Sequence, residues 1–142
     1  MKLILDASMA LGWLIQRTST GEAQLAQQAF DEVRASGALV PALWFPEIAN
    51  TLLVFERAKR LTVYNSTAFL SDLARLQIEQ DDAPSTLAQT RWMDLGRIYR
   101  LTAYDATYLE LALRTGRTLA TFDTRLADAV RKAGGRVFGD AA

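Results

Sequence analysis

The sequence predicts an α/β fold, a three-layer α/β/α sandwich built around a central, mainly parallel sheet. Short apolar runs of strand length alternate along the chain with longer segments whose apolar residues recur at helical spacing. Strands separated by helices favour parallel β-α units in which helices cover both faces of one sheet. The chain has 142 residues, half of them hydrophobic, and this length is near the commonest domain size. We therefore predict one domain over residues 1–142.

The elements are predicted in chain order from the spacing of apolar residues and from the residues that begin or end helices. The first strand leads into Asp6, and either Asp6 or Ser8 could cap the helix that follows, because both have side-chain oxygens suited to free backbone N–H groups. Gly37 and Gly116 end helices, and Pro46 stands where a first-turn proline is tolerated. Polar residues break the pattern at 18–21 and 81–85. The predicted strands are 2–5, 38–41, 117–122 and 136–138, and the predicted helices are 9–14, 22–35, 46–60, 62–76, 87–99, 102–115 and 124–133.

Composition excludes several classes of enzyme. The chain contains no Cys and no His, which excludes thiol nucleophiles, disulfides, imidazole bases and the usual zinc sites. Its 16 basic and 16 acidic residues cancel, which argues against binding nucleic acid through bulk charge. Met1 is followed too soon by an acidic residue for a signal peptide, and no apolar run approaches the ~20 residues of a membrane span. We expect a cytoplasmic protein without a membrane segment.

Four acidic residues stand at positions that point to chemistry. Asp6 and Asp123 each follow a predicted strand, and the carboxyl ends of parallel strands meet at the edge of a sheet where ligands bind. Glu47 and Asp105 lie in the first turns of predicted helices, where capping or balance of the helix dipole is the alternative explanation for either one alone. Carboxylates gathered from distant positions repel one another, and a hard divalent cation is the usual reason a fold tolerates them.

The residues around these acids form a recognisable pattern. The strings are LDAS at 5–8, PEIAN at 46–50, LTAYDATYLELA at 101–112 and LATFDTRL at 119–126. In order, spacing and flanking residues, they resemble the PIN-domain family, and most closely the VapC-type ribonuclease toxins of type II toxin–antitoxin systems. The resemblance runs from residue 3 to about residue 138.

The resemblance implies a PIN-like α/β/α fold and an acidic pocket that binds Mg²⁺ or Mn²⁺. By position, the acidic quartet that it implies as catalytic and metal-binding is Asp6, Glu47, Asp105 and Asp123. The smaller polar residues expected to support this quartet or position water are Ser8, Asn50 and Thr121. Tyr104 and Tyr108 flank the third acid and are predicted to be packing residues, and no residue is assigned to an organic cofactor.

The function implied is that of a metal-dependent endoribonuclease toxin, which cleaves RNA by a metal-activated water and leaves a 5′-phosphate and a 3′-hydroxyl. The expected substrate is tRNA or ribosomal RNA, and the expected partners are a cognate antitoxin and a second copy of the chain. The apolar helices between Glu47 and Leu76 suggest where such a partner binds. Short length and the absence of further domains favour the toxin over a PIN nuclease of RNA processing.

Two alternatives belong to other classes of function. A catalytically idle PIN-fold binding module is disfavoured by the complete quartet. A phosphate-accepting receiver-like domain would need an acidic pair in its first loop and a Lys after a late strand, and neither is evident.

Overall fold

The structure, a computed structural model, describes residues 1–17 and 19–141. Thr18, the first residue of the predicted polar break, lies outside the described residues. Within them, one sheet has the strand order β3-β2-β1-β4, and every neighbouring pair is parallel. The strands are β1 (Leu3–Leu5), β2 (Ala38–Val40), β3 (Ile78–Gln80) and β4 (Leu119–Ala120).

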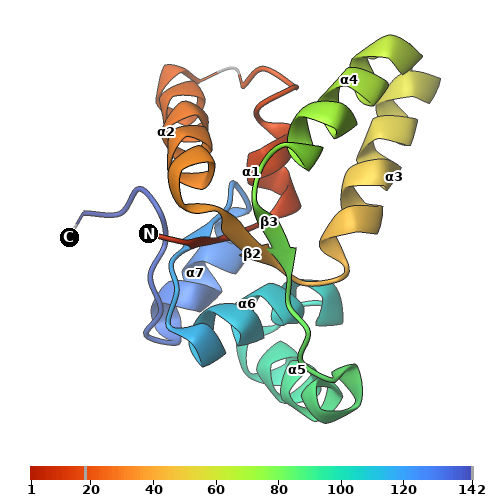
Figure 1. Cartoon of the computed structure of the whole chain (residues 1–142). Coiled ribbons are helices and arrows are strands. Elements are labelled where there is room, and N and C mark those ends of the chain that lie inside the picture. Colours follow the sequence, from red (N-terminus) through yellow and green to blue (C-terminus); the bar gives the residue numbers. More distant parts are fainter. Residues whose placement is uncertain (18, 142) are drawn as a thin grey trace.

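Helices cover both faces of this sheet, which confirms the predicted three-layer α/β/α fold. Figure 1 shows α1 to α4 on one side of the strands and α5 to α7 on the other. None of the helices in the described part of the chain is long and apolar enough to cross a membrane. The helices are α1 (Ala7–Leu11), α2 (Thr20–Ser36), α3 (Trp44–Arg57), α4 (Val63–Ala74), α5 (Ser85–Tyr99), α6 (Ala103–Thr115) and α7 (Thr124–Lys132).

The centre of the sheet explains why the first strand is continuously apolar. Leu3, Ile4 and Leu5 are all fully buried, as expected of a parallel strand that is covered on both faces. Ile4 pairs with Leu39 of β2 on one side and with Leu119 of β4 on the other. This register places the carboxyl ends of β1 and β4 next to each other.

Local signals at the helix ends behave mostly as predicted. Gly37 ends α2 with φ of 77°, and a Cβ there would lie 2.7 Å from the carbonyl oxygen of Gln77, so glycine is needed on both grounds. Thr62 closes a capping box with Asn65 at the start of α4. Asp6, one of the two expected caps, is the N-cap residue of α1, but its side chain makes no cap hydrogen bond. Its carboxylate is used elsewhere.

Several elements differ from the sequence prediction, and α1, α3 and β4 do so only in their bounds: α1 is Ala7–Leu11 rather than 9–14, α3 ends at Arg57 rather than at residue 60, and β4 is Leu119–Ala120 rather than 117–122. Strand β3 was not predicted, because it lies at the sheet edge, has no buried residue and contains a single apolar side chain, Ile78. The predicted strand at 136–138 is reduced to one isolated parallel bridge between Leu119 and Val137. Helix α4 ends at Ala74 rather than at residue 76.

The topology prepares a site at one edge of the sheet. The chain moves outward from β1 to β2 and β3 and then returns to place β4 on the other side of β1. In open parallel sheets, ligands bind beyond the carboxyl ends of strands at such a reversal. Asp6 follows β1 directly, and Thr121 follows β4.

Candidate active site

Asp6 is the centre of a hydrogen-bonded cluster that joins the ends of β1 and β4. Its side chain is buried, and its Oδ2 accepts hydrogen bonds from the hydroxyls of Ser8 and Thr121, each at 2.6 Å. The same two hydroxyl oxygens accept from backbone groups, Ser8 from the N–H of Phe122 at 3.0 Å and Thr121 from the N–H of Asp123 at 2.9 Å. Each hydroxyl therefore relays a hydrogen bond from the β4 side to one carboxylate oxygen.

The hydrogen bonds of the cluster do not fully offset the cost of burying the charged form of Asp6. Burial raises its pKa above the usual range, the hydroxyls of Ser8 and Thr121 lower it, and the charge of Asp123 raises it again, with a net upward shift. Both hydroxyls bind Oδ2, and no side chain of the described residues donates to Oδ1. Besides these hydroxyls, the backbone N–H of Ala7 also lowers the pKa of the Asp6 carboxyl.

Asp123 is fixed by the helix that it begins. Its Oδ1 accepts from the backbone N–H groups of Arg125 and Leu126, at 2.9 and 3.1 Å, as the cap of α7. A carboxylate at this position is favoured by the partial positive charge of a helix N-terminus. Capping therefore orients the acid while its second oxygen stays outside these two bonds.

Close packing holds the segment between Thr121 and Asp123 in place. A Cβ at Gly12 would lie 2.9 Å from the ring of Phe122, so the loop after α1 comes as near to this ring as a glycine allows. On the ring, the guanidinium of Arg17 lies 4.3 Å from the centroid, within the range of a cation–π contact.

Glu47 reaches the site from α3 and is held by a tyrosine of α6. Its Oε1 accepts a hydrogen bond of 2.5 Å from the hydroxyl of Tyr108, which is fully buried. Burial raises the pKa of Glu47, the bond from Tyr108 lowers it, and the charges of Asp6 and Asp105 raise it, with a net upward shift. The pKa of Tyr108 lies far above its usual value because of burial and of the charges of Asp6 and Glu47, so the phenol remains a donor.

Asp105 lies in the first turn of α6, where the hydroxyl of Thr102 accepts from its backbone N–H at 3.1 Å. Burial raises the pKa of Asp105, and the charges of Asp123 and Asp6 raise it further. The hydroxyl of Thr102 and the charge of the exposed Arg125 lower the pKa of Asp105, with a net upward shift. Among residues 1–17 and 19–141, no ion pair joins Arg125 to an acidic side chain.

The structure thus brings the four predicted acids into one electrostatic cluster. Each of Asp6, Glu47 and Asp105 has its pKa raised by the charge of at least one other member of the quartet. No three acidic side chains of the described residues are arranged to hold an ion directly. The donor set still fits Mg²⁺, which takes oxygen ligands, binds through one or two carboxylates and keeps several waters. We infer that the remaining acids would act on those waters.

The supporting residues fall into two groups. Ser8 and Thr121 contact Asp6 as described, whereas Asn50 is exposed on α3 and takes part in none of the side-chain hydrogen bonds of the cluster. Tyr108 was expected only to pack, and Arg125 drew no attention in the sequence. The spacing of Tyr108 from Asp105, three residues along one helix, is the signal that could have placed both on one face.

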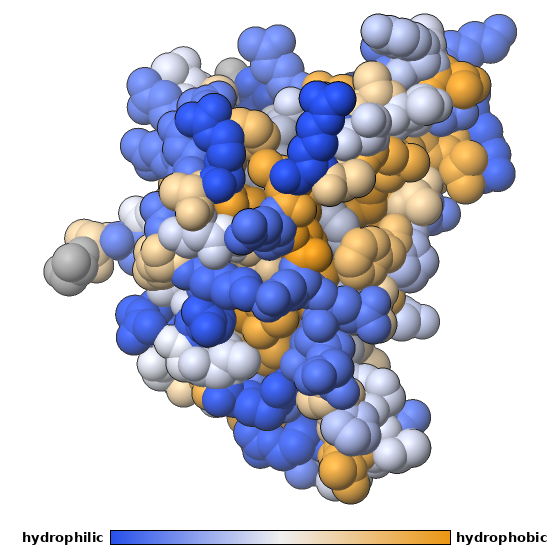
Figure 2. All heavy atoms as spheres, in the orientation of Figure 1, coloured by the Kyte–Doolittle hydropathy of each residue, from blue (hydrophilic) through white to orange (hydrophobic). Residues whose placement is uncertain are grey.

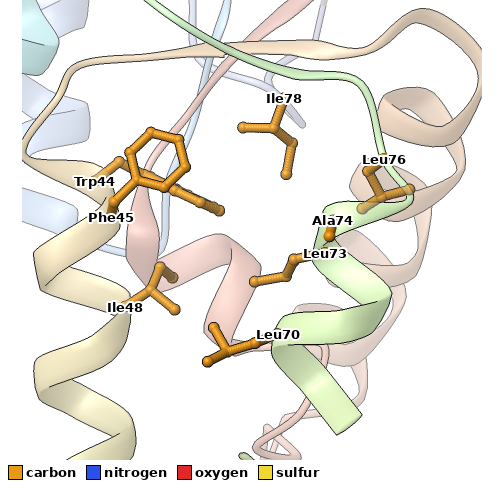
Figure 3. A pocket seen from close by; sticks show the side chains of 8 residues that line it. All are labelled: Trp44, Phe45, Ile48, Leu70, Leu73, Ala74, Leu76 and Ile78. Atoms are coloured by element: carbon orange, nitrogen blue, oxygen red, sulfur yellow. The ribbon is translucent and has the colours of Figure 1, made fainter. Parts of the chain in front are cut away.

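A second feature is an apolar groove between α3 and α4. It has a volume of about 300 Å³, and Figure 3 shows side chains from both helices facing each other across it. Figure 2 shows hydrophobic surface over this part of the molecule. Phe45 and Leu70 are 44% and 47% exposed. The groove is lined by Trp44, Phe45, Ile48, Leu70, Leu73, Ala74, Leu76 and Ile78.

Comparison with known proteins agrees with this architecture. The structure of PAE2754 from Pyrobaculum aerophilum superposes with a TM-score of 0.69 at 18% sequence identity, over 94% of this chain and 92% of that one. FitAcB from Neisseria gonorrhoeae superposes with a TM-score of 0.61 at 16% identity, over 96% of each chain. At such identities the likeness establishes the fold. No curated protein sequence matches the chain.

The family assignment comes from the sequence model of the PIN domain, which matches residues 3–132. The matched span contains the whole sheet and all four acids of the cluster. This chain belongs to the PIN domain family.

Proposed function

We propose that this protein is a metal-dependent endoribonuclease and the toxin of a toxin–antitoxin pair. Members of the PIN domain family are typically metal-dependent nucleases. The observation that carries the proposal is the coupled cluster of Asp6, Glu47, Asp105 and Asp123 at the carboxyl edge of the sheet. Mutually repelling carboxylates, of which Asp6 is buried and the other three are partly buried, are unfavourable by themselves and become favourable beside a divalent cation.

In this proposal Mg²⁺ or Mn²⁺, when bound, supplies positive charge to the scissile phosphate and lowers the pKa of a water. Asp6 and Asp105 hold the ion or its waters, and Glu47 and Asp123 complete the negative shell. Ser8 and Thr121 fix the rotamer of Asp6 through its Oδ2, which keeps Oδ1 directed away from the relay. Arg125 is exposed and its charge lowers the pKa of Asp105, and in this proposal its guanidinium contacts a phosphate of the RNA backbone.

The expected products are those that the PIN-domain resemblance implies, and the composition of the chain supports them. Cleavage through the RNA 2′-hydroxyl typically relies on a general base and acid such as His, and this sequence has none. Attack by water leaves a 5′-phosphate and a 3′-hydroxyl. We expect the substrate to be a structured RNA such as tRNA or ribosomal RNA.

Cleavage of total RNA with Mn²⁺ or Mg²⁺, with and without chelator, followed by mapping of the end groups, tests the nuclease. Asp105→Asn is the matched negative variant. Cleavage that survives the chelator, or that yields 2′,3′-cyclic phosphates, would contradict the proposed chemistry.

The apolar groove between α3 and α4 supports the toxin assignment, because such a surface calls for a protein partner. In the proposal, an apolar segment of the antitoxin occupies it, and the chain also forms a homodimer. Leu70→Asp would place a charge in the groove, whereas Val63→Asp changes an exposed residue at the start of the same helix that does not line it.

The partner is sought in the adjacent open reading frame, by co-expression with the chain and co-purification. We expect Leu70→Asp to lose the complex and Val63→Asp to keep it. If the chain cleaves RNA but the neighbouring gene product neither binds it nor relieves the growth arrest that a toxin causes on expression, the protein would instead be an RNA-processing nuclease. If the chain neither cleaves RNA nor binds metal, it would be an idle PIN-fold binding module.

A further inference from the structure

Tyr108 differs from the other buried residues of α6 in having a polar end that contacts the acidic cluster. Its side chain is 0% exposed, and its hydroxyl donates to Oε1 of Glu47 at 2.5 Å. Tyr108 and Asp105 are three residues apart on α6 and so lie on neighbouring turns of one helix face, whereas Glu47 belongs to α3 on the other side of the sheet. One hydrogen bond therefore connects the two helices that carry the second and third acids.

Glu47 needs such a bond more than its neighbours do. Asp6 is held by two hydroxyls and Asp123 by two backbone N–H groups, and aspartate has few rotamers. Glu47 has a longer side chain, is only partly buried, and feels the charges of Asp6 and Asp105. Repulsion and side-chain entropy both favour rotation of Glu47 toward solvent. In the described part of the chain, the Tyr108 hydroxyl is its only side-chain hydrogen-bond donor.

A phenol is suited to this role because it is neutral. A Lys or Arg in the same place would hold Glu47 equally well, but its positive charge would compete with a cation for the cluster. The hydroxyl of Tyr108 orients one carboxylate oxygen and adds no charge. Its complete burial also keeps water from replacing the bond.

We infer that Tyr108 is a positioning residue of the proposed nuclease site: through its hydroxyl it holds Glu47 turned toward Asp6 and Asp105, and thereby strengthens binding of the divalent cation. The inference rests on the proposed function. A residue that only packs would lose nothing when the hydroxyl is removed, since the ring fills the same space in Tyr108→Phe.

The test is Mn²⁺ binding by isothermal titration calorimetry in the absence of RNA. Loss of an outer partner of a metal ligand typically weakens metal affinity by ~10–100-fold, and we expect a Kd increase of about this size for Tyr108→Phe. Tyr64→Phe removes the same oxygen from a tyrosine that is 79% exposed on α4, and we expect no change. At saturating Mn²⁺, the RNA cleavage rate of Tyr108→Phe should return to within about threefold of wild type. The substitution weakens Mn²⁺ binding but leaves all four carboxylates in place, so an excess of Mn²⁺ compensates for it.

A double variant separates positioning from a general effect on folding. In Glu47→Gln the charge that Tyr108 positions is already absent, so adding Tyr108→Phe should leave the Mn²⁺ affinity of Glu47→Gln unchanged. A double variant that binds Mn²⁺ much more weakly than Glu47→Gln would overturn the inference. So would a Tyr108→Phe protein with wild-type affinity, or one whose lost cleavage is not restored by Mn²⁺. If the wild-type protein binds no Mn²⁺, the proposed function itself fails. If the wild-type protein binds Mn²⁺ and Tyr108→Phe binds it equally well, only the inference about Tyr108 fails.

Discussion

Removal of the Thr121 hydroxyl gives the sharpest test of how the acidic cluster is built. Thr121 is 5% exposed, donates to Oδ2 of Asp6 at 2.6 Å and accepts from the N–H of Asp123 at 2.9 Å. Thr121→Val keeps the shape of the side chain and deletes both bonds. A hydrogen bond to a charged group contributes about 1.5–3 kcal/mol, and a buried N–H left without an acceptor costs about 1–3 kcal/mol. Since water can reach the half-buried Asp123, we expect a loss of about 2–4 kcal/mol in the free energy of unfolding.

The control is Thr118→Val, at the residue that immediately precedes β4. Thr118 is 6% exposed, and its hydroxyl has only a long contact of 3.3 Å with Nε of Arg136. Burial and the deleted atoms match those of Thr121, so the two variants differ in the relay to Asp6. We expect Thr118→Val to lose no more than about 1 kcal/mol.

The assay is urea unfolding at several pH values. The Thr121 bond lowers the pKa of Asp6, so it stabilises the ionised carboxylate, and its contribution is present when Asp6 is ionised and lost as the pH falls through the folded-state pKa. The difference between Thr121→Val and Thr118→Val should therefore be largest near neutral pH and shrink in acid. Equal losses for the two variants at neutral pH would refute the proposed relay.

Three further predictions address the acids and their surroundings. Asp105→Asn should reduce metal-dependent cleavage by about 10²-fold or more, since about 3 kcal/mol of charge stabilisation corresponds to such a factor. Circular dichroism and the unfolding midpoint should show that this variant is still folded. Retained activity would contradict a role for Asp105. The pKa values of Asp6, Glu47 and Asp105 are raised, so the metal-free folded state binds protons more tightly than the unfolded state. Its urea midpoint should therefore rise as the pH falls from neutral toward the ordinary pKa range of carboxyl groups. Saturating Mn²⁺ should abolish that rise, and a midpoint that falls over this range without metal would be the opposite result. Arg125→Ala should raise the KM for RNA by about tenfold, as expected for loss of one charge-assisted phosphate contact of ~1.4 kcal/mol, whereas Arg75→Ala, an exposed cation at the end of α4, should not change it in the same kinetic assay.

Much of the fold was predictable because it depends on local patterns. The apolar run of β1, the glycines after α2 and α6, and the helical periodicity between them each carry their own signal. Strand β3 has no such signal, since an edge strand with one apolar residue, Ile78, is defined by its pairing with β2 rather than by its own burial. The bridge at Val137 shows the converse case, in which an apolar string is too weakly paired to form a strand.

The acidic site likewise has features that the sequence predicts and features that only the tertiary structure determines. The sequence determined which carboxylates could meet, because Asp6 and Asp123 follow strands and Glu47 and Asp105 begin helices. Only the tertiary structure decided how they are held: Thr121 meets Asp6 across 115 positions of sequence, and Tyr108 meets Glu47 across 61. A residue's place in a helix or strand follows from its neighbours in the chain, but the partner of a buried hydroxyl depends on packing between elements that are remote in sequence, and that packing is fixed only when the whole core forms.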